Sequence, residues 1–130
     1  MKKVVIKYIS HIFQNEHIEK IELEENGYVE ESEGKVTLNF TSAGENKKVN
    51  NSFIFEESQI TIIRDLSILK FGLNERYKCK YETEYGSLML ETKLKKYLKL
   101  GNEFVINYEL NIDNESIGSY VVRVSYKEMS

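Results

Sequence analysis

The sequence predicts an all-β fold in which an antiparallel up-and-down meander of about eight to ten strands closes into a β-barrel. Three observations lead to this fold class: apolar and polar residues alternate with a period of two, turn-forming residues recur at short intervals, and proline is absent from all 130 positions. Alternation places successive side chains on opposite faces of a sheet. A sheet with one apolar and one charged face must close on itself or pack against a second sheet.

The alternation is clearest at residues 103–112, where Phe104, Ile106 and Tyr108 share one face while Asn107 and Glu109 share the other. It recurs at residues 36–40, 53–55, 77–85, 88–94 and 120–126. The faces that we assign to the interior are rich in tyrosine: Tyr77, Tyr81, Tyr85, Tyr108, Tyr120 and Tyr126. Residues 91–100 also suit a helical period, but the alternation that begins at Leu88 continues through Leu94 and Leu98 and favours a strand.

Turn signals separate these runs, because their residues tolerate positive φ or hydrogen-bond to their own backbone. The predicted turns are Asn15-Glu16, Asn26-Gly27, Glu33-Gly34, Ala43 to Asn46, Glu57-Ser58, Gly72 to Glu75, Tyr85-Gly86, Gly101-Asn102 and Asp113 to Ser116. Their spacing is typical of short strands joined by hairpins.

The length and net charge of the chain limit the number of domains and the classes of partner that we expect. At 15.3 kDa the chain has the size of one domain, which we take to span residues 1–130. A net charge of -3 gives no general field for nucleic acid or an anionic membrane, so we expect neither as a partner. Residues 2–13 resemble a signal peptide at first, but Lys7 and His11 interrupt the apolar run and no small-residue cleavage site follows, so we interpret the segment as a strand. The single Cys79 is consistent with a reducing cytoplasm.

No group of residues forms a convincing catalytic, metal or cofactor motif, so we expect a protein that is not an enzyme. Cys79 has no histidine near it in sequence, and a buried structural cysteine is the favoured interpretation. His11 and His17 flank a predicted turn and could face each other, but a metal site needs further ligands. Two charged clusters are interpreted as solvated surface: Glu24, Glu25, Glu30, Glu31 and Glu33 around turns, and Lys93, Lys95, Lys96 and Lys99 on an outward face.

Arg64 is the most informative polar residue. It shares a strand face with Ile60 and Ile62, so the guanidinium points inward if the isoleucines do. The interior faces assigned above carry no carboxylate, which leaves tyrosine hydroxyls, backbone carbonyls or an anionic ligand as its partners. The alternative is that Arg64 lies at a strand end and reaches solvent, with its stem packed on aromatic rings.

The run from Asn26 to Tyr126 resembles the YwiB-like family of uncharacterised bacterial proteins. The resemblance is carried by Gly27-Tyr28, Arg64, the Tyr81-x-Thr83-x-Tyr85-Gly86 segment, Leu88, Leu90, Thr92 and Tyr108. It implies a calycin-like barrel, related in shape to lipocalins and fatty-acid-binding proteins, and it implies no activity. The sequence departs from the family after Arg64, where a glycine is usual and Asp65-Leu66 stands here.

Two functions remain open at this point. The first is a barrel that binds a small amphipathic or anionic ligand in its lumen, at candidate residues Arg64, Tyr81, Thr83, Tyr85, Thr92 and Tyr108. The second is a solid barrel that acts as a structural or protein-interaction module, with homodimerisation as one form of it.

Overall fold

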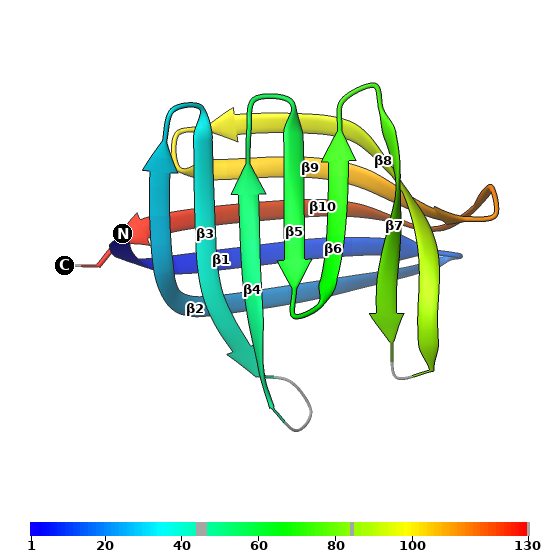
Figure 1. Ribbon diagram of the computed structural model, residues 1–130, viewed down its shortest axis with the longest axis horizontal. Coiled ribbons are helices and arrows are strands. Elements are labelled where there is room, and N and C mark those ends of the chain that lie inside the picture. Colours follow the sequence, from blue (N-terminus) through cyan, green and yellow to red (C-terminus); the bar gives the residue numbers. More distant parts are fainter. Residues whose placement is uncertain (44–46, 84, 130) are drawn as a thin grey trace.

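The computed structural model describes residues 1–43, 47–83 and 85–129 and contains ten strands (Figure 1). Their bounds are β1 Lys2–Gln14, β2 His17–Ser32, β3 Lys35–Ala43, β4 Lys48–Phe55, β5 Gln59–Arg64, β6 Ser67–Gly72, β7 Arg76–Thr83, β8 Gly86–Leu100, β9 Glu103–Ile112 and β10 Glu115–Glu128. No helix occurs in these three ranges, and therefore none that could cross a membrane. The predicted all-β fold is confirmed.

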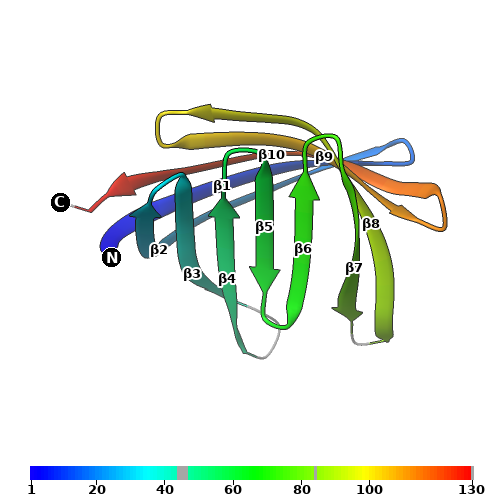
Figure 2. The same cartoon turned by 45° about the horizontal axis from the view of Figure 1, so that its top comes forward.

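All ten strands belong to one antiparallel sheet in the order β6-β5-β4-β3-β2-β1-β10-β9-β8-β7. Figures 1 and 2 show the sheet curled into two layers: β3 to β7 form one, and β1, β2, β9 and β10 run across behind them. The two end strands, β6 and β7, are neighbours in the chain and meet to close the barrel. Both chain termini lie at the same end, where the amide of Met129 donates to the carbonyl of Lys3.

Two long strands, β2 and β8, carry the sheet from one layer into the other, because each pairs with different neighbours along its two halves. Residues 17–26 of β2 pair only with β1, and residues 27–32 pair with β3. Gly27 stands at this transition because β3 approaches closely there: an added Cβ would lie 2.3 Å from the carbonyl oxygen of Asn39 and 2.8 Å from Ile6 Cδ1. The predicted turn at Asn26-Gly27 is therefore wrong, and the glycine serves close packing inside a continuous strand.

The strand prediction for residues 91–100 is confirmed, although its faces differ from the expectation. A β-bulge between Leu94 and Lys96 inserts an extra residue into β8. Beyond the bulge Tyr97, rather than Leu98, lies on the inner face, where its hydroxyl donates to the carbonyl of Glu56 (2.8 Å). Leu98 faces outward and is 41% exposed. The bulge explains why this segment also fits a helical period.

Most of the other predicted turns coincide with the hairpins, and the residues at several of them take positive φ, including Asn15, Gly34, Gly101, Asp113 and Asn114. The segment Gly44 to Asn46 lies outside the described residues. Between β5 and β6, Asp65 adopts a φ of 51°. Its carboxylate accepts a hydrogen bond from the amide of Asn50 (3.2 Å), so aspartate replaces the glycine that the family pattern expects.

Side chains, rather than a ladder, hold β6 against β7. The isolated bridges near this junction join Gly72 to Glu75, just before β7, and Leu73 to Leu94 of β8. The buried Thr92 hydroxyl donates to the carbonyl of Lys70 (2.5 Å), and the amide of Lys70 donates to Cys79 Sγ (3.4 Å). Farther along, the amide of Glu82 donates to Ser67 Oγ (3.1 Å). We call these contacts the seam.

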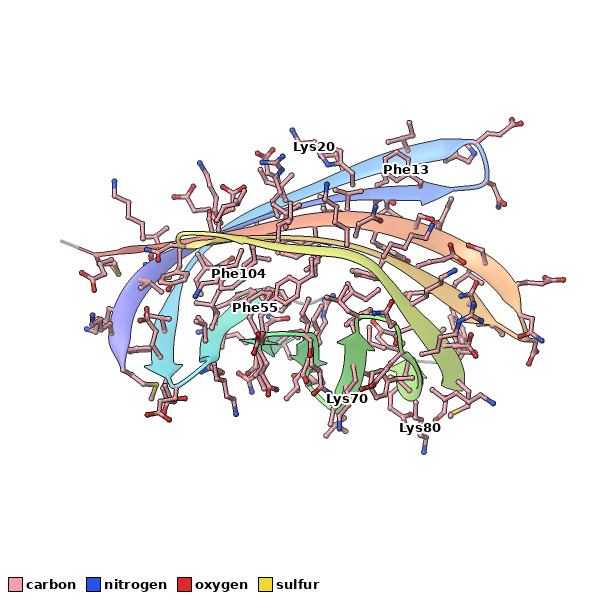
Figure 3. The ribbon with its side chains drawn as sticks, turned by 90° about the horizontal axis from the view of Figure 1, so that it is seen from above. Phe13, Lys20, Phe55, Lys70, Lys80 and Phe104 are labelled. Carbon is pink, nitrogen blue, oxygen red and sulfur yellow. The ribbon has the colours of Figure 1, made fainter. Side chains whose placement is uncertain are left out.

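Aromatic rings fill the interior nearer the chain termini. Phe55 of β4 and Phe104 of β9 stack with their centroids 3.8 Å apart and their planes 5° apart, and Figure 3 shows them between the two layers. Phe53 contacts both Phe40 and Phe55. Full burial of the Phe104 and Phe71 side chains anchors this core.

Candidate functional site: the tyrosine cluster and Arg64

Four inward-facing tyrosines from different strands lie near one another: Tyr8 of β1, Tyr81 of β7, Tyr108 of β9 and Tyr120 of β10. Tyr108 and Tyr120 stack with centroids 4.8 Å apart, and Tyr108 also contacts Phe71 at 4.5 Å. Tyr8 stacks on Phe53 at 5.7 Å. We call these four residues the tyrosine cluster. They pack on the aromatic core, and Tyr8 lies close enough to Arg64 to feel its charge.

Most hydroxyls of the tyrosine cluster form no hydrogen bond within the described part of the protein. Tyr81, Tyr108 and Tyr120 make none through their hydroxyls to a described residue, and the hydroxyl of the buried Ser10, which is 1% exposed, has no partner of good hydrogen-bond geometry. Ser10 and Tyr8 are neighbours on the inner face of β1, and their hydroxyls interact with each other. Because a hydroxyl without an internal partner keeps its capacity to donate, this group is suited to meeting acceptors that come from outside the chain.

Burial governs the acidity of these tyrosines. It raises the pKa of Tyr108 well above its ordinary value, and the neighbouring hydroxyls of Tyr8, Tyr120 and Tyr81 add to the effect. Burial also raises the pKa of Tyr8, while the Ser10 hydroxyl and the charge of Arg64 partly offset it. Tyr8, Tyr108 and Tyr120, whose pKa values burial raises, therefore stay protonated near neutral pH and act as hydrogen-bond donors.

Arg64 ends β5 and its side chain is exposed, which agrees with the alternative in which it reaches solvent from a strand end. Its strand neighbours are Asn51 and Ser67. The other two arginines each meet a carboxylate: Arg76 lies 3.2 Å from Glu91 and Arg123 lies 3.1 Å from Glu103. Arg64 has no such partner in the described part of the chain.

An apolar surface adjoins these polar groups. Strand register places Leu23 opposite Tyr8, and Ile21 opposite Ser10, on the inner face of β2. Leu88 lies opposite Tyr81 on β8. These three side chains are 37%, 36% and 43% exposed, whereas the core residues are fully covered. The inner face of the sheet is thus accessible beside the tyrosine cluster.

The expectation that no carboxylate shares the inner face is wrong. The same register places Glu19 and Glu25 on the inner face of β2, opposite Ile12 and Ile6. Glu31, farther along, accepts a hydrogen bond from the hydroxyl of Tyr126 (2.8 Å). The prediction failed because the assumed turn at Asn26-Gly27 left the inner and outer faces of β2 unassigned, and it placed Glu25 beside a turn that does not exist.

The remaining predicted ligand residues lie in three different settings. Thr92 is fully buried, and its hydroxyl is held by the seam. Tyr85 is 93% exposed between β7 and β8, because β7 ends before it, so its assignment to the interior is wrong. The side chain of Thr83 lies outside the described residues. Of the predicted residues, the structure brings together Tyr81 and Tyr108, with Arg64 near Tyr8.

The other candidate chemistry does not assemble. His11 lies opposite Lys20 and His17 opposite Gln14, so the two histidines face opposite sides of the β1–β2 hairpin. Lys95 of the basic cluster pairs with Glu109 at 3.0 Å. No group of three metal-ligating side chains occurs among residues 1–43, 47–83 and 85–129.

An open cleft of about 440 Å³ lies at the other end of the barrel, where the β2–β3, β4–β5 and β8–β9 hairpins meet. Tyr97 and Glu31 line it, but each already has a hydrogen-bond partner within the protein, Glu56 and Tyr126 respectively. Lys35, Glu57 and Lys99 also line the cleft, so it carries side chains of both charges.

Comparison with known proteins places the chain in a family without an assigned activity. A domain of unknown function, DUF1934, matches residues 6–124. The chain belongs to this family. The crystal structure of the ywiB protein from Bacillus subtilis superimposes with a TM-score of 0.86 at 18% identity, over 99% of this chain and 93% of that one. No curated protein matches. The likeness to the ywiB protein concerns the fold.

Sequence reasoning missed Tyr8, Ser10, Ile21 and Leu23 as site residues. The alternation of Val4, Ile6, Tyr8 and Ser10 could have identified the first two, because Val4 and Ile6 are the inward residues of β1. Ile21 and Leu23 could not be assigned without the register between β1 and β2.

Proposed function

We propose that this DUF1934 protein is a binding module for a small amphipathic anion, held at the end of the barrel that carries Arg64. The single observation that supports it best is the coexistence of an arginine without a carboxylate partner and three inward tyrosine hydroxyls without hydrogen bonds, those of Tyr81, Tyr108 and Tyr120, among the described residues. Arginine and hydroxyl donors together match the acceptor oxygens of a carboxylate or phosphate.

The distribution of charge orients the ligand. Glu19 and Glu25 on the inner face of β2 would repel an anionic head, whereas Arg64 on β5 would attract it. The apolar part then rests on Ile21, Leu23 and Leu88, whose exposed inner faces would be covered on binding. Calycin-like shape, which the resemblance implies, fits this role because such barrels hold one small ligand. The lone buried Cys79 fits a reducing, cytoplasmic setting, and we assign the chain no catalytic step and no cofactor.

The test uses dansylaminoundecanoic acid, a fluorescent carboxylate with an apolar stem. The wild type should bind it in one saturable step and melt at a higher temperature in its presence. Arg64→Leu should weaken binding by roughly 10- to 100-fold, because one charge-assisted contact is lost. Arg123→Leu is the matched control: it removes an exposed arginine from the outer face and should leave the affinity unchanged. Equal affinities for wild type and Arg64→Leu would overturn the assignment of the head group.

The second candidate function, a solid barrel that acts through its outer surface, is favoured by a different observation. Phe13, Ile18 and Leu98 face outward and are 42%, 71% and 41% exposed; Figure 3 shows Phe13 on the β1–β2 hairpin. Absence of saturable binding across fatty acids, acyl phosphates and aromatic acids would favour this candidate over the ligand-binding module.

A further inference from the structure

We propose that a second copy of this chain pairs with the free edge of β2, so that two barrels join through antiparallel β2 strands. Residues 17–26 of β2 pair with β1 on one side and with no described strand on the other. Every described side chain in this stretch is exposed except that of Glu25, which is half-buried. A long unpaired edge is a ready template for another strand. This inference does not depend on the proposed ligand.

The hydrogen-bonding pattern defines which residues would form the pairing. Gln14 and His17 flank a two-residue turn, so they form a hydrogen-bonded pair, and such pairs alternate along the hairpin. The odd-numbered residues of β2 therefore direct their backbone groups toward β1. The even-numbered residues, Ile18, Lys20, Glu22, Glu24 and Asn26, direct their N–H and C=O groups to the free edge.

One two-fold register makes the side chains complementary. If Ile21 lies opposite Ile21 of the second copy, Lys20 of each copy faces Glu22 of the other, and His17 faces Glu25. The even-numbered residues then form about eight backbone hydrogen bonds across the edge. Leu23 meets the stem of Glu19, and no like charges stand directly opposite.

Neighbouring registers are unfavourable. Sliding the two-fold axis to Glu22 places that residue opposite itself and Glu19 opposite Glu25. Sliding it to Lys20 places two lysines opposite each other. Within each copy, Lys20 and Glu22 are 3.5 Å apart and more than half exposed, so their internal pair contributes little and does not compete with the exchange between copies. Charge complementarity therefore selects a second copy in a single register.

Sedimentation velocity over a range of protein concentrations tests the pairing. The wild type should dimerise reversibly. Lys20→Glu and Glu22→Lys each place like charges opposite one another twice, so each should raise the dissociation constant at least about tenfold. The double variant Lys20→Glu/Glu22→Lys restores opposite charges and should recover the dimer. Lys70→Glu, on the opposite layer in Figure 3, is the matched control and should not change it.

A mixing experiment is specific for the register. The Lys20→Glu variant carries two glutamates at positions 20 and 22, and the Glu22→Lys variant carries two lysines. Each variant should be a monomer alone, and an equimolar mixture should form a heterodimer. A wild type that stays monomeric at every concentration would overturn the proposal. So would a dimer that neither single substitution weakens, because it would use another surface.

Discussion

Replacing Thr92 by valine tests whether side chains close the barrel. Thr92→Val keeps the shape of the side chain and removes the hydroxyl that donates to the carbonyl of Lys70. That carbonyl lies where β6 has no ladder to β7, so it loses its partner in a site from which water is excluded. A buried carbonyl left without a donor costs about 1–3 kcal/mol. For a domain of this size, the melting temperature should fall by roughly 3–12 °C.

Urea unfolding followed by fluorescence or circular dichroism measures the change, and hydrogen exchange of the Lys70 and Glu82 amides locates it. Thr61→Val is the matched control, because Thr61 lies opposite Lys70 on the outer face of β5 and makes no hydrogen bond through its side chain among the described residues. Thr61→Val should change stability by less than about 0.5 kcal/mol. If Thr92→Val proves as stable as the control, and its exchange pattern is that of the wild type, the seam does not depend on this hydroxyl.

Two further substitutions and one change of pH should alter the stability of the protein in defined directions. Ser10→Ala should be neutral or stabilising in urea unfolding, because it removes a buried hydroxyl without a partner of good hydrogen-bond geometry; clear destabilisation would show that Ser10 has such a partner. Gly27→Ala should destabilise by about 1–3 kcal/mol or more, since its Cβ would collide with the carbonyl of Asn39; an unchanged urea midpoint would contradict the close approach. Burial raises the pKa of Tyr97 and of Tyr126 to about 12, above the value near 10 of an unfolded tyrosine. Unfolding therefore releases protons at high pH, and stability should be flat with respect to these groups below pH 10 and fall between pH 10 and 12. A flat profile of stability against pH in that range would refute the burial of these hydroxyls.

The fold class could be predicted from the sequence because strand alternation and hairpin residues are local signals. Residues 103–112 show this well. The alternation places Phe104, Ile106, Tyr108 and Leu110 on the inner face, and all four side chains are buried in β9. The failures came where tertiary structure overrides local preference. Gly27 resembles a turn residue in sequence, but the close approach of β3 requires it, and the bulge at Lys95 reverses the faces of β8.

The candidate site was predictable only in part for the same reason. Tyr81, Tyr108 and Arg64 lie on faces that the alternation identifies, and the structure brings Tyr81 close to Tyr108 and Arg64 close to Tyr8. Thr92 was selected by resemblance, which does not distinguish a ligand contact from a contact that closes the barrel. The contribution of β2 depends on pairing between residues far apart in the sheet, and no local pattern reveals it.

The strand order has a consequence for how the protein is made. The sheet runs outward in both directions from the pair β1 and β10, so the two strands farthest apart in the chain occupy its middle. During synthesis the hairpins from β1 to β6 and from β7 to β9 can assemble as they emerge, but no ladder joins these two groups until β10 leaves the ribosome and pairs with β1. A circular permutant that links residues 1 and 129 and opens between β6 and β7 would read its strands in spatial order. It should fold faster than the natural arrangement, because every ladder would then connect consecutive strands.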